Sequence, residues 1–168
     1  YEVGLNMMQS HGKEEEQYRE IAKKITEWGT VYVLYFADSL GNMKPSHIKN
    51  ISKIDKDISV IISKETIPEC RITQIQPKNL EILELRIRCA FYGCYNLIAG
   101  IDPGGTTGLA IIGGNRVLFQ NVFDNIKHLI RIIESIYEEI GLNTIKIGTG
   151  SPPERNQIIQ SLEKYSAI

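Results

Sequence analysis

Residues 97–114 constrain the fold of this chain more than any other stretch, because they have the pattern of two short apolar strands joined by a tight turn. The run Leu-Ile-Ala-Gly-Ile-Asp is followed by Pro-Gly-Gly-Thr-Thr-Gly and then by Leu-Ala-Ile-Ile-Gly-Gly. Two such runs separated by a few turn residues predict a β-hairpin. Pro103 restricts φ after the first strand, and Gly104, Gly105 and Gly108 permit the positive φ angles that we expect in the reversal.

One acidic residue, Asp102, ends the first strand of this hairpin. An isolated carboxylate at the mouth of an apolar strand is costly unless another group pairs with it. A divalent metal ion or a phosphate-bound metal would stabilise it, and so would the backbone N–H groups of Gly104 or Gly105 in an Asx turn. Asp102 is therefore the centre of the candidate site.

The composition sets broad bounds on the class of protein. A length of 168 residues suffices for one ordinary domain or two small ones. No apolar run approaches the roughly 18 residues that a membrane-spanning helix needs, and the polar N-terminus does not resemble a signal peptide, so we expect a cytoplasmic protein with no membrane partner. The formal net charge of −1 provides no general attraction to nucleic acid, which would have to bind through a local patch or through metal ions.

The three cysteines, Cys70, Cys89 and Cys94, form neither an even disulfide framework nor a metal-binding spacing. We expect reduced thiols, as in a cytosolic protein.

Hydrophobic periodicity divides the chain into a loose N-terminus over residues 1–12, a small α/β domain over 13–94 and a third part over 95–168. In the small domain we predict strands at 31–37, 58–63 and 71–75 and helices at 13–28, 46–54 and 78–92. The last helix lies between Pro77 and Gly93. Its predicted apolar stripe leaves Cys89 on the more polar side, as a thiol that fills a helix interface.

The third part continues from the hairpin through a turn at 113–115 into a strand at 116–122. Three strands joined by short turns are antiparallel. A helix capped by Asp124 and ended by Gly141 then leads to a strand at 144–147, which a right-handed crossover places parallel to the first strand. Ser151 and Glu154 form a predicted capping box before a helix that runs to about Tyr165.

This order of elements resembles the ribonuclease H-like fold. The segment Gly-Ile-Asp-Pro-Gly-Gly-Thr-Thr-Gly-Leu-Ala-Ile at 100–111 resembles the start of RuvC-type Holliday-junction resolvases and their uncharacterised archaeal relatives. Residues 147–156, Ile-Gly-Thr-Gly-Ser-Pro-Pro-Glu-Arg-Asn, are similar to the fourth-strand region of one such branch. The resemblance covers residues 97–162. It implies an α/β fold with a ribonuclease H-like mixed sheet, incomplete at the C-terminus and preceded by a small α/β region.

The resemblance implies that Asp102 binds Mg²⁺ or Mn²⁺ in a nuclease that acts on structured DNA or RNA. In that superfamily further carboxylates complete a two-metal site, in which paired cations stabilise the attacking and leaving oxygens. The second carboxylate normally ends the fourth strand, where this chain has Gly148 or Thr149. The later carboxylates belong to a fifth strand and a terminal helix, which would lie beyond Ile168.

Three explanations fit the missing carboxylates. The chain is a fragment of a longer protein, an intact but degenerate member, or a rearranged fold in which the first half supplies a strand. In the third case the strand at 31–37 would bring Asp38 near Asp102 as a second carboxylate.

Residues around Asp102 are candidates for binding phosphate or substrate. The loop at 148–151 is expected beside Asp102, because parallel neighbouring strands end at the same edge of the sheet. The helix after it is expected to attract anions through its free N–H groups. Each residue also has a structural interpretation as part of an ordinary turn or capped helix. The candidates are Gly104, Gly105, Thr106, Thr107, Thr149, Ser151 and Arg155.

The leading functional hypothesis is a metal-dependent nuclease or nucleic-acid-processing protein. One alternative is a catalytically degenerate protein that binds nucleic acid or serves in an assembly, with a second copy of the chain as a further potential partner. Another is an actin/sugar-kinase-like domain, in which an Asp-x-Gly-Gly-Thr hairpin such as that at 102–106 holds the phosphates of ATP and Mg²⁺. A structural α/β module is the third.

Overall fold

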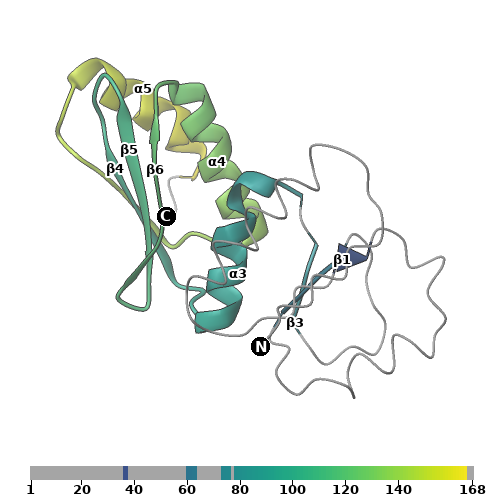
Figure 1. The fold of residues 1–168 in the computed structure, drawn as a ribbon. Helices are drawn as coiled ribbons and strands as arrows, with labels where there is room; N and C mark the ends of the chain where they lie inside the picture. The colour runs from purple at the N-terminus through teal and green to yellow at the C-terminus, as the bar shows by residue number, and fades with distance from the viewer. Residues whose placement is uncertain (1–35, 38–59, 64–72, 77, 166–168) are drawn as a thin grey trace, which may run out of the picture. The chain divides into compact units, whose positions relative to one another are not determined.

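The computed structural model describes residues 36–37, 60–63, 73–76 and 78–165 (Figure 1). The chain divides into two compact units, Tyr1–Leu80 and Glu81–Ile168, and each is described by itself. The sequence pattern predicts this boundary between residues 94 and 95. The helix before the hairpin falls in the second unit because its residues Ile82, Leu85 and Cys89 belong to the core of that unit.

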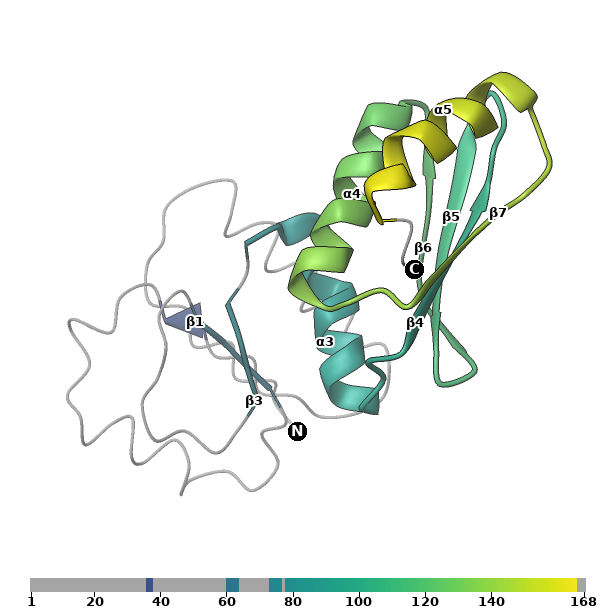
Figure 2. The same cartoon turned by 180° about the vertical axis from the view of Figure 1, so that it is seen from behind.

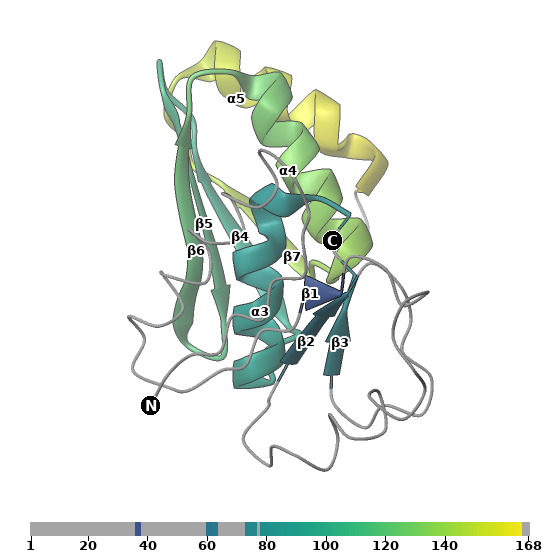
Figure 3. The same ribbon diagram turned by 45° about the vertical axis from the view of Figure 1, so that its right-hand side comes forward.

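The described part of the first unit is a parallel sheet in the order β1-β2-β3 (Figure 3). Its strands are β1 (Phe36–Ala37), β2 (Val60–Ser63) and β3 (Thr73–Ile75). Each lies inside a predicted strand, and the other residues of those predicted strands lie outside the described ones. The predicted loose terminus and the helices at 13–28 and 46–54 lie outside the described residues.

The second unit contains a mixed sheet in the order β6-β5-β4-β7 (Figure 2). The strands are β4 (Leu97–Asp102), β5 (Thr107–Gly113), β6 (Arg116–Phe123) and β7 (Thr144–Ile147). The first three form an antiparallel meander, and β7 pairs with β4 in parallel. The predicted strand order and directions are therefore confirmed.

The helices of this unit follow the predicted order, with corrected starts. They are α3 (Leu83–Tyr92), preceded by the 3₁₀ turn η2 (Leu80–Ile82), then α4 (Ile126–Glu139) and α5 (Pro152–Leu162), which continues into η3 (Glu163–Tyr165). The α-helix thus begins at Leu83 rather than at residue 78, because the chain enters it through the tighter 3₁₀ turn. The cap of α4 is Asn125, whose side chain accepts a hydrogen bond from the Lys127 N–H at 2.8 Å, and not Asp124.

All three α-helices lie on one face of the second sheet, as Figures 1 and 2 show. Residues in alternation on β4, namely Leu97, Ala99 and Ile101, point into the core between sheet and helices. The helices contribute Leu85, Cys89, Leu129, Ile133, Ile158 and Leu162 to the same core. None of the helices in the described residues has the length and apolarity that crossing a membrane requires.

Cys89 is buried in this core with 1% of its surface exposed, so its predicted position on the polar side of α3 was wrong. Leu83, Leu85, Ile87 and Cys89 are all buried, and successive members of this set lie on nearly opposite sides of the helix. Helix α3 is therefore buried on two sides, and a single-stripe interpretation could not place Cys89. Its role as a packing thiol agrees with its burial.

The two hairpin turns differ in their backbone conformation. Gly114 and Asn115 have φ angles of +54° and +62°, the pattern of a type I′ turn between β5 and β6. None of Gly104, Gly105 and Gly108 has a positive φ. The prediction of positive φ in the first turn was therefore wrong, because four residues, 103–106, complete that reversal while only two complete the second.

A side chain at position 113 would crowd the core of the second unit. A Cβ there would lie 2.8 Å from Cδ1 of Leu118 and 2.9 Å from Cδ2 of Leu97, both buried. We expect Gly113→Ala to lower the free energy of unfolding by about 1–3 kcal/mol through overpacking, measured by urea denaturation. Gly105→Ala is the control, since no atom lies within 4 Å of its added Cβ. Equal stability of the two variants would contradict this account.

Burial, with a smaller contribution from Cys94, raises the pKa of the Cys89 thiol to about 12. Because the thiolate is the reactive form, we expect iodoacetamide at neutral pH to alkylate the half-buried Cys94 well before Cys89 in the folded protein. Peptide mass mapping over time measures both rates. If Cys89 and Cys94 react at similar rates in native buffer, and urea does not change the ratio of the two rates, then Cys89 is accessible in the folded protein.

Candidate functional site

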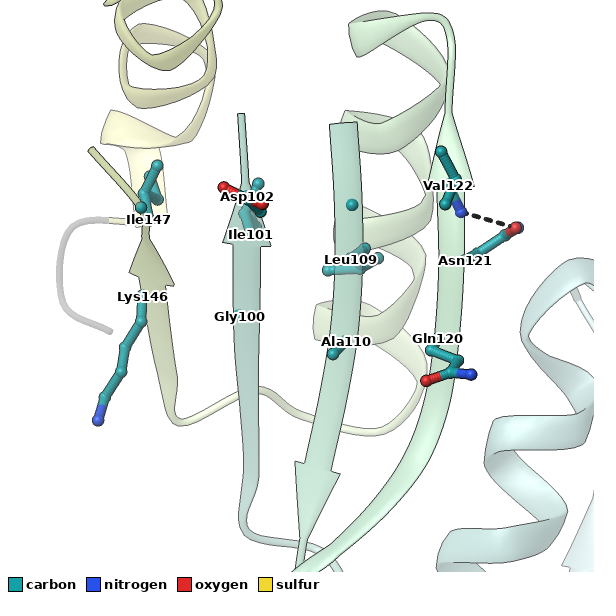
Figure 4. Close-up of a pocket in the computed structure, with 12 residues that line it drawn as sticks. Gly100, Ile101, Asp102, Leu109, Ala110, Gln120, Asn121, Val122, Lys146 and Ile147 are labelled. Atoms are coloured by element: carbon teal, nitrogen blue, oxygen red, sulfur yellow. Dashed lines mark hydrogen bonds between the residues drawn. The ribbon is translucent and has the colours of Figure 1, made fainter. Parts of the chain in front are cut away.

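Asp102 ends the central strand β4 with an exposed side chain (Figure 4). It pairs with Gly108 across the hairpin, and the buried Pro103 follows it. No hydrogen bond between its carboxylate and Gly104 or Gly105 occurs in the part of the chain that the structure describes, so the Asx-turn interpretation is not supported. The turn is closed instead by Thr107, which is 1% exposed and donates its hydroxyl to the Gly104 carbonyl at 3.5 Å.

The loop after β7 lies directly against Asp102. The Gly148 N–H donates to the Ile101 carbonyl at 2.8 Å, which extends the parallel ladder beyond β7. A Cβ on Gly148 would lie 3.4 Å from Oδ1 of Asp102, and one on Gly150 would lie 3.6 Å from the same atom. The predicted proximity of this loop to Asp102 is therefore confirmed.

Glycine is required at position 150 by this close approach. A Cβ there would lie 2.6 Å from the Pro103 carbonyl oxygen, a distance at which the backbone would have to shift. The two loops at the carboxyl ends of β4 and β7 thus meet backbone to backbone. Of the two positions at which the resemblance implies a second carboxylate, Gly148 has no side chain and Thr149 carries a hydroxyl.

The start of α5 differs from the predicted anion site. Its first two residues are Pro152 and Pro153, which have no N–H groups to offer an anion. Ser151 makes no side-chain bond to the helix backbone. Its hydroxyl donates to the Glu154 carboxylate instead, so the reciprocal capping box is not formed and a carboxylate already occupies the helix start.

The remaining candidates differ in their exposure. Thr106 and Thr149 are exposed, whereas Arg155 is half-buried with an Nε atom that has no hydrogen-bond partner among the described residues. Arg155 donates its backbone N–H to the Ser151 carbonyl at 3.0 Å, as a first-turn helix residue does. Asp38, the proposed second carboxylate, lies outside the described residues.

Two hollows flank the hairpin turn. One, of about 860 Å³, lies on the sheet and is lined among others by Gly100, Asp102, Gly108, Ala110, Gln120 and Lys146 (Figure 4). We call it the trough. The other, of about 400 Å³, lies between the turn and the starts of α4 and α5, with Gly104, Gly105, Asp124, Lys127 and Glu154 among its lining residues.

Sequence reasoning missed Gln120 and Lys146 because they carry no motif. Only the pairing register brings them close to the strand of Asp102. Gly100 in that strand pairs with Lys146 on one side and with Ala110 on the other, and Ala110 pairs with Gln120. Within the described ranges, no three His, Cys, Asp or Glu side chains come together as a metal-binding group.

Searches against protein families, curated proteins and solved structures find no match for this chain.

The hydrogen bond from Ser151 holds the pKa of the Glu154 carboxyl below its ordinary value of 4.5. A lowered folded-state pKa stabilises the fold above the unfolded pKa, and this contribution disappears as the pH falls through the folded pKa. We expect Ser151→Ala to raise the Glu154 pKa toward 4.5, measured by NMR titration of the side-chain carboxyl carbon. Ser161→Ala is the matched control, since Ser161 donates to the Gln157 carbonyl in the same helix. An unchanged titration in Ser151→Ala would refute the assigned cause.

Proposed function

We propose that the second unit binds the phosphate backbone of structured DNA or RNA through a divalent cation at Asp102, as a nuclease or nucleic-acid-processing protein of the ribonuclease H-like, RuvC type. The observation that carries the proposal is the position of Asp102 at the carboxyl end of β4, with the parallel strand β7 ending beside it. In open α/β sheets, ligands bind in the crevice outside the carboxyl ends of the strands.

The residues around Asp102 fit a cation of the Mg²⁺ type that is bound together with phosphate. Mg²⁺ keeps several waters and is commonly held by one or two carboxylates plus the phosphates of the ligand. Asp102 provides one exposed carboxylate, and the absence of side chains at Gly148 and Gly150 leaves its Oδ1 atom accessible to such a cation. The bound cation would neutralise phosphate charge and polarise a phosphorus–oxygen bond.

A two-metal centre does not fit the residues that the structure describes, since they place a single carboxylate at this point and gather no metal-binding group of three. Asp102 in this proposal holds the phosphate-bound cation. The exposed hydroxyls of Thr106 and Thr149 donate to phosphate oxygens next to it.

Two alternatives have particular observations in their favour. Gly148 and Thr149 stand where the resemblance implies a second carboxylate, and the lack of an acid there favours a degenerate protein that binds nucleic acid without cleaving it. The Gly104–Gly105–Thr106 turn that follows Asp102 favours the actin/sugar-kinase-like alternative, in which the ligand is ATP with Mg²⁺.

Replacing the carboxylate tests the proposal. We expect Asp102→Asn to reduce Mg²⁺- or Mn²⁺-dependent nicking of a branched or single-stranded substrate by about a hundredfold, which corresponds to about 2.7 kcal/mol of transition-state stabilisation. The matched control is Asp124→Asn, which removes the same charge from an exposed position outside the trough. Gel assays of cleavage and fluorescence anisotropy of binding measure both variants.

The same assays separate the alternatives. Metal-dependent binding that is lost in Asp102→Asn, with no cleavage by the wild type, supports the degenerate protein. Thermal stabilisation by Mg²⁺ and ATP without nucleic-acid binding supports the kinase-like alternative. Wild-type protein that responds to no metal, nucleotide or nucleic acid contradicts all three.

A further inference from the structure

Two glycines in the interior of the second sheet have no role in its packing. Gly100 and Gly108 lie in β4 and β5 without positive φ angles. A Cβ on Gly100 would have the Ala110 carbonyl oxygen as its nearest atom, at 4.0 Å, and one on Gly108 would lie 3.8 Å from Cβ of Asp102. Both are ordinary contact distances, so the fold would accept a side chain at either position.

A glycine in a strand interior destabilises a protein by about 0.5–1 kcal/mol relative to alanine. Such a glycine often marks a bulge, a tight bend or a place at which a ligand or another backbone approaches closely. The irregularity in the pairing of β5 lies at Ile111 and Ile112, away from both glycines. Gly113 is the contrast within the same sheet, since a Cβ there would meet two leucine side chains at under 3 Å. Gly100 and Gly108 are therefore better explained by a ligand than by the fold.

The pairing register shows what surrounds these glycines. One row across the open face consists of Gln120, Ala110, Gly100 and Lys146, and the next contains Val122, Gly108 and Asp102. The two central strands thus form a floor of small residues, while the two outer strands carry long side chains. Because neighbouring strands lie about 4.8 Å apart, the outer strands are separated by roughly 14 Å.

The two ends of the trough differ in chemistry. In the row beyond Gly100 and Ala110, Ile98 pairs with Ile112 and Ile112 with Val117, and the last two are 37% and 52% exposed. Aliphatic side chains that do not line the trough therefore lie beyond this end of it. At the other end lies Asp102 (Figure 4).

A ligand that fills this shape has a flat body with apolar faces and a charged end. The flat body lies on the backbone of Gly100 and Gly108, and the charged end reaches the cation at Asp102. Among the lining residues, Gln120 offers amide donors and an acceptor, and Lys146 offers a positive charge at the outer borders. A volume of about 860 Å³ falls in the range of small-molecule sites, about 300–1,000 Å³.

We propose that the trough takes one nucleoside phosphate unit of a nucleic-acid strand, with its base flat on the Gly100–Ala110 floor and its phosphate at Asp102. This inference rests on the proposed function for its phosphate end, and it adds the site for the base.

Filling the floor tests the inference, because the same change should preserve the fold and block the ligand. We expect Gly100→Ala, Gly100→Val and Ala110→Val to unfold at the wild-type temperature or above, since strand glycine is unfavourable and valine has high strand propensity. We expect the two valine variants to weaken binding of a short fluorescein-labelled single-stranded oligodeoxynucleotide in Mg²⁺ by about tenfold, measured by fluorescence anisotropy. The control is Val117→Phe, which adds more bulk to the same face outside the trough and should bind as the wild type does.

Several outcomes would overturn the inference. Wild-type affinity in both stable valine variants shows that the floor carries no base, and a large loss of stability in Gly100→Ala shows that the fold does need this glycine. A free mononucleotide that competes as well as the oligonucleotide overturns the assignment to a strand. Equal loss of binding in Val117→Phe shows a general effect of bulk on this face.

Failure of this inference and of the proposed function can be told apart. If Asp102→Asn removes Mg²⁺-dependent binding and the valine variants do not, the proposed function stands and the trough does not bind the base. If the valine variants weaken binding and Asp102→Asn has no effect, the trough binds the base without the proposed cation. No binding by the wild type in Mg²⁺ overturns both.

Discussion

The second unit depends on strand β4, which is hydrogen-bonded to a neighbour on each side. It pairs antiparallel with β5 and parallel with β7, and alternation along it sends Leu97, Ala99 and Ile101 into the core. A one-residue slip would exchange the two faces and bury Asp102 among the aliphatic side chains beneath the helices. The cost of burying an unpaired carboxylate and exposing three apolar residues thus enforces the register that also brings Asp102 to the open face.

The pairing of β4 with β7 also brings the glycine loop to Asp102. The bond from the Gly148 N–H to the Ile101 carbonyl continues the ladder past the last strand residue, and Gly150 then approaches the Pro103 carbonyl. Two backbone loops meet where side chains would otherwise separate them. The consequence is an exposed carboxylate with open space around it, in place of a cluster of acids.

The described strands and turns of the second sheet contain glycines of two kinds. Gly113 and Gly114 are dictated by close packing or by a left-handed backbone, whereas Gly100 and Gly108 meet neither condition. Gly100 and Gly108 lower the stability of the strands, and the packing gains nothing from them. They lie side by side with Asp102, which is why the ligand hypothesis unites the strand interior with the strand end.

The sequence by itself determined the hairpin, the meander, the crossover helix and the parallel fourth strand, because period-two and helical patterns act over a few residues and turns lie between them. It also indicated that Asp102 and the loop at 148–151 would be neighbours. Only the tertiary structure decided that α3 is buried on two sides, with Cys89 in the core. It also decided that Ser151 bonds Glu154 rather than the helix backbone, and that Gln120 and Lys146 border the open face beside Asp102. These features depend on contacts between segments that are distant in the sequence or on a choice among several local hydrogen-bond acceptors. Such contacts and choices leave no period or motif in the chain.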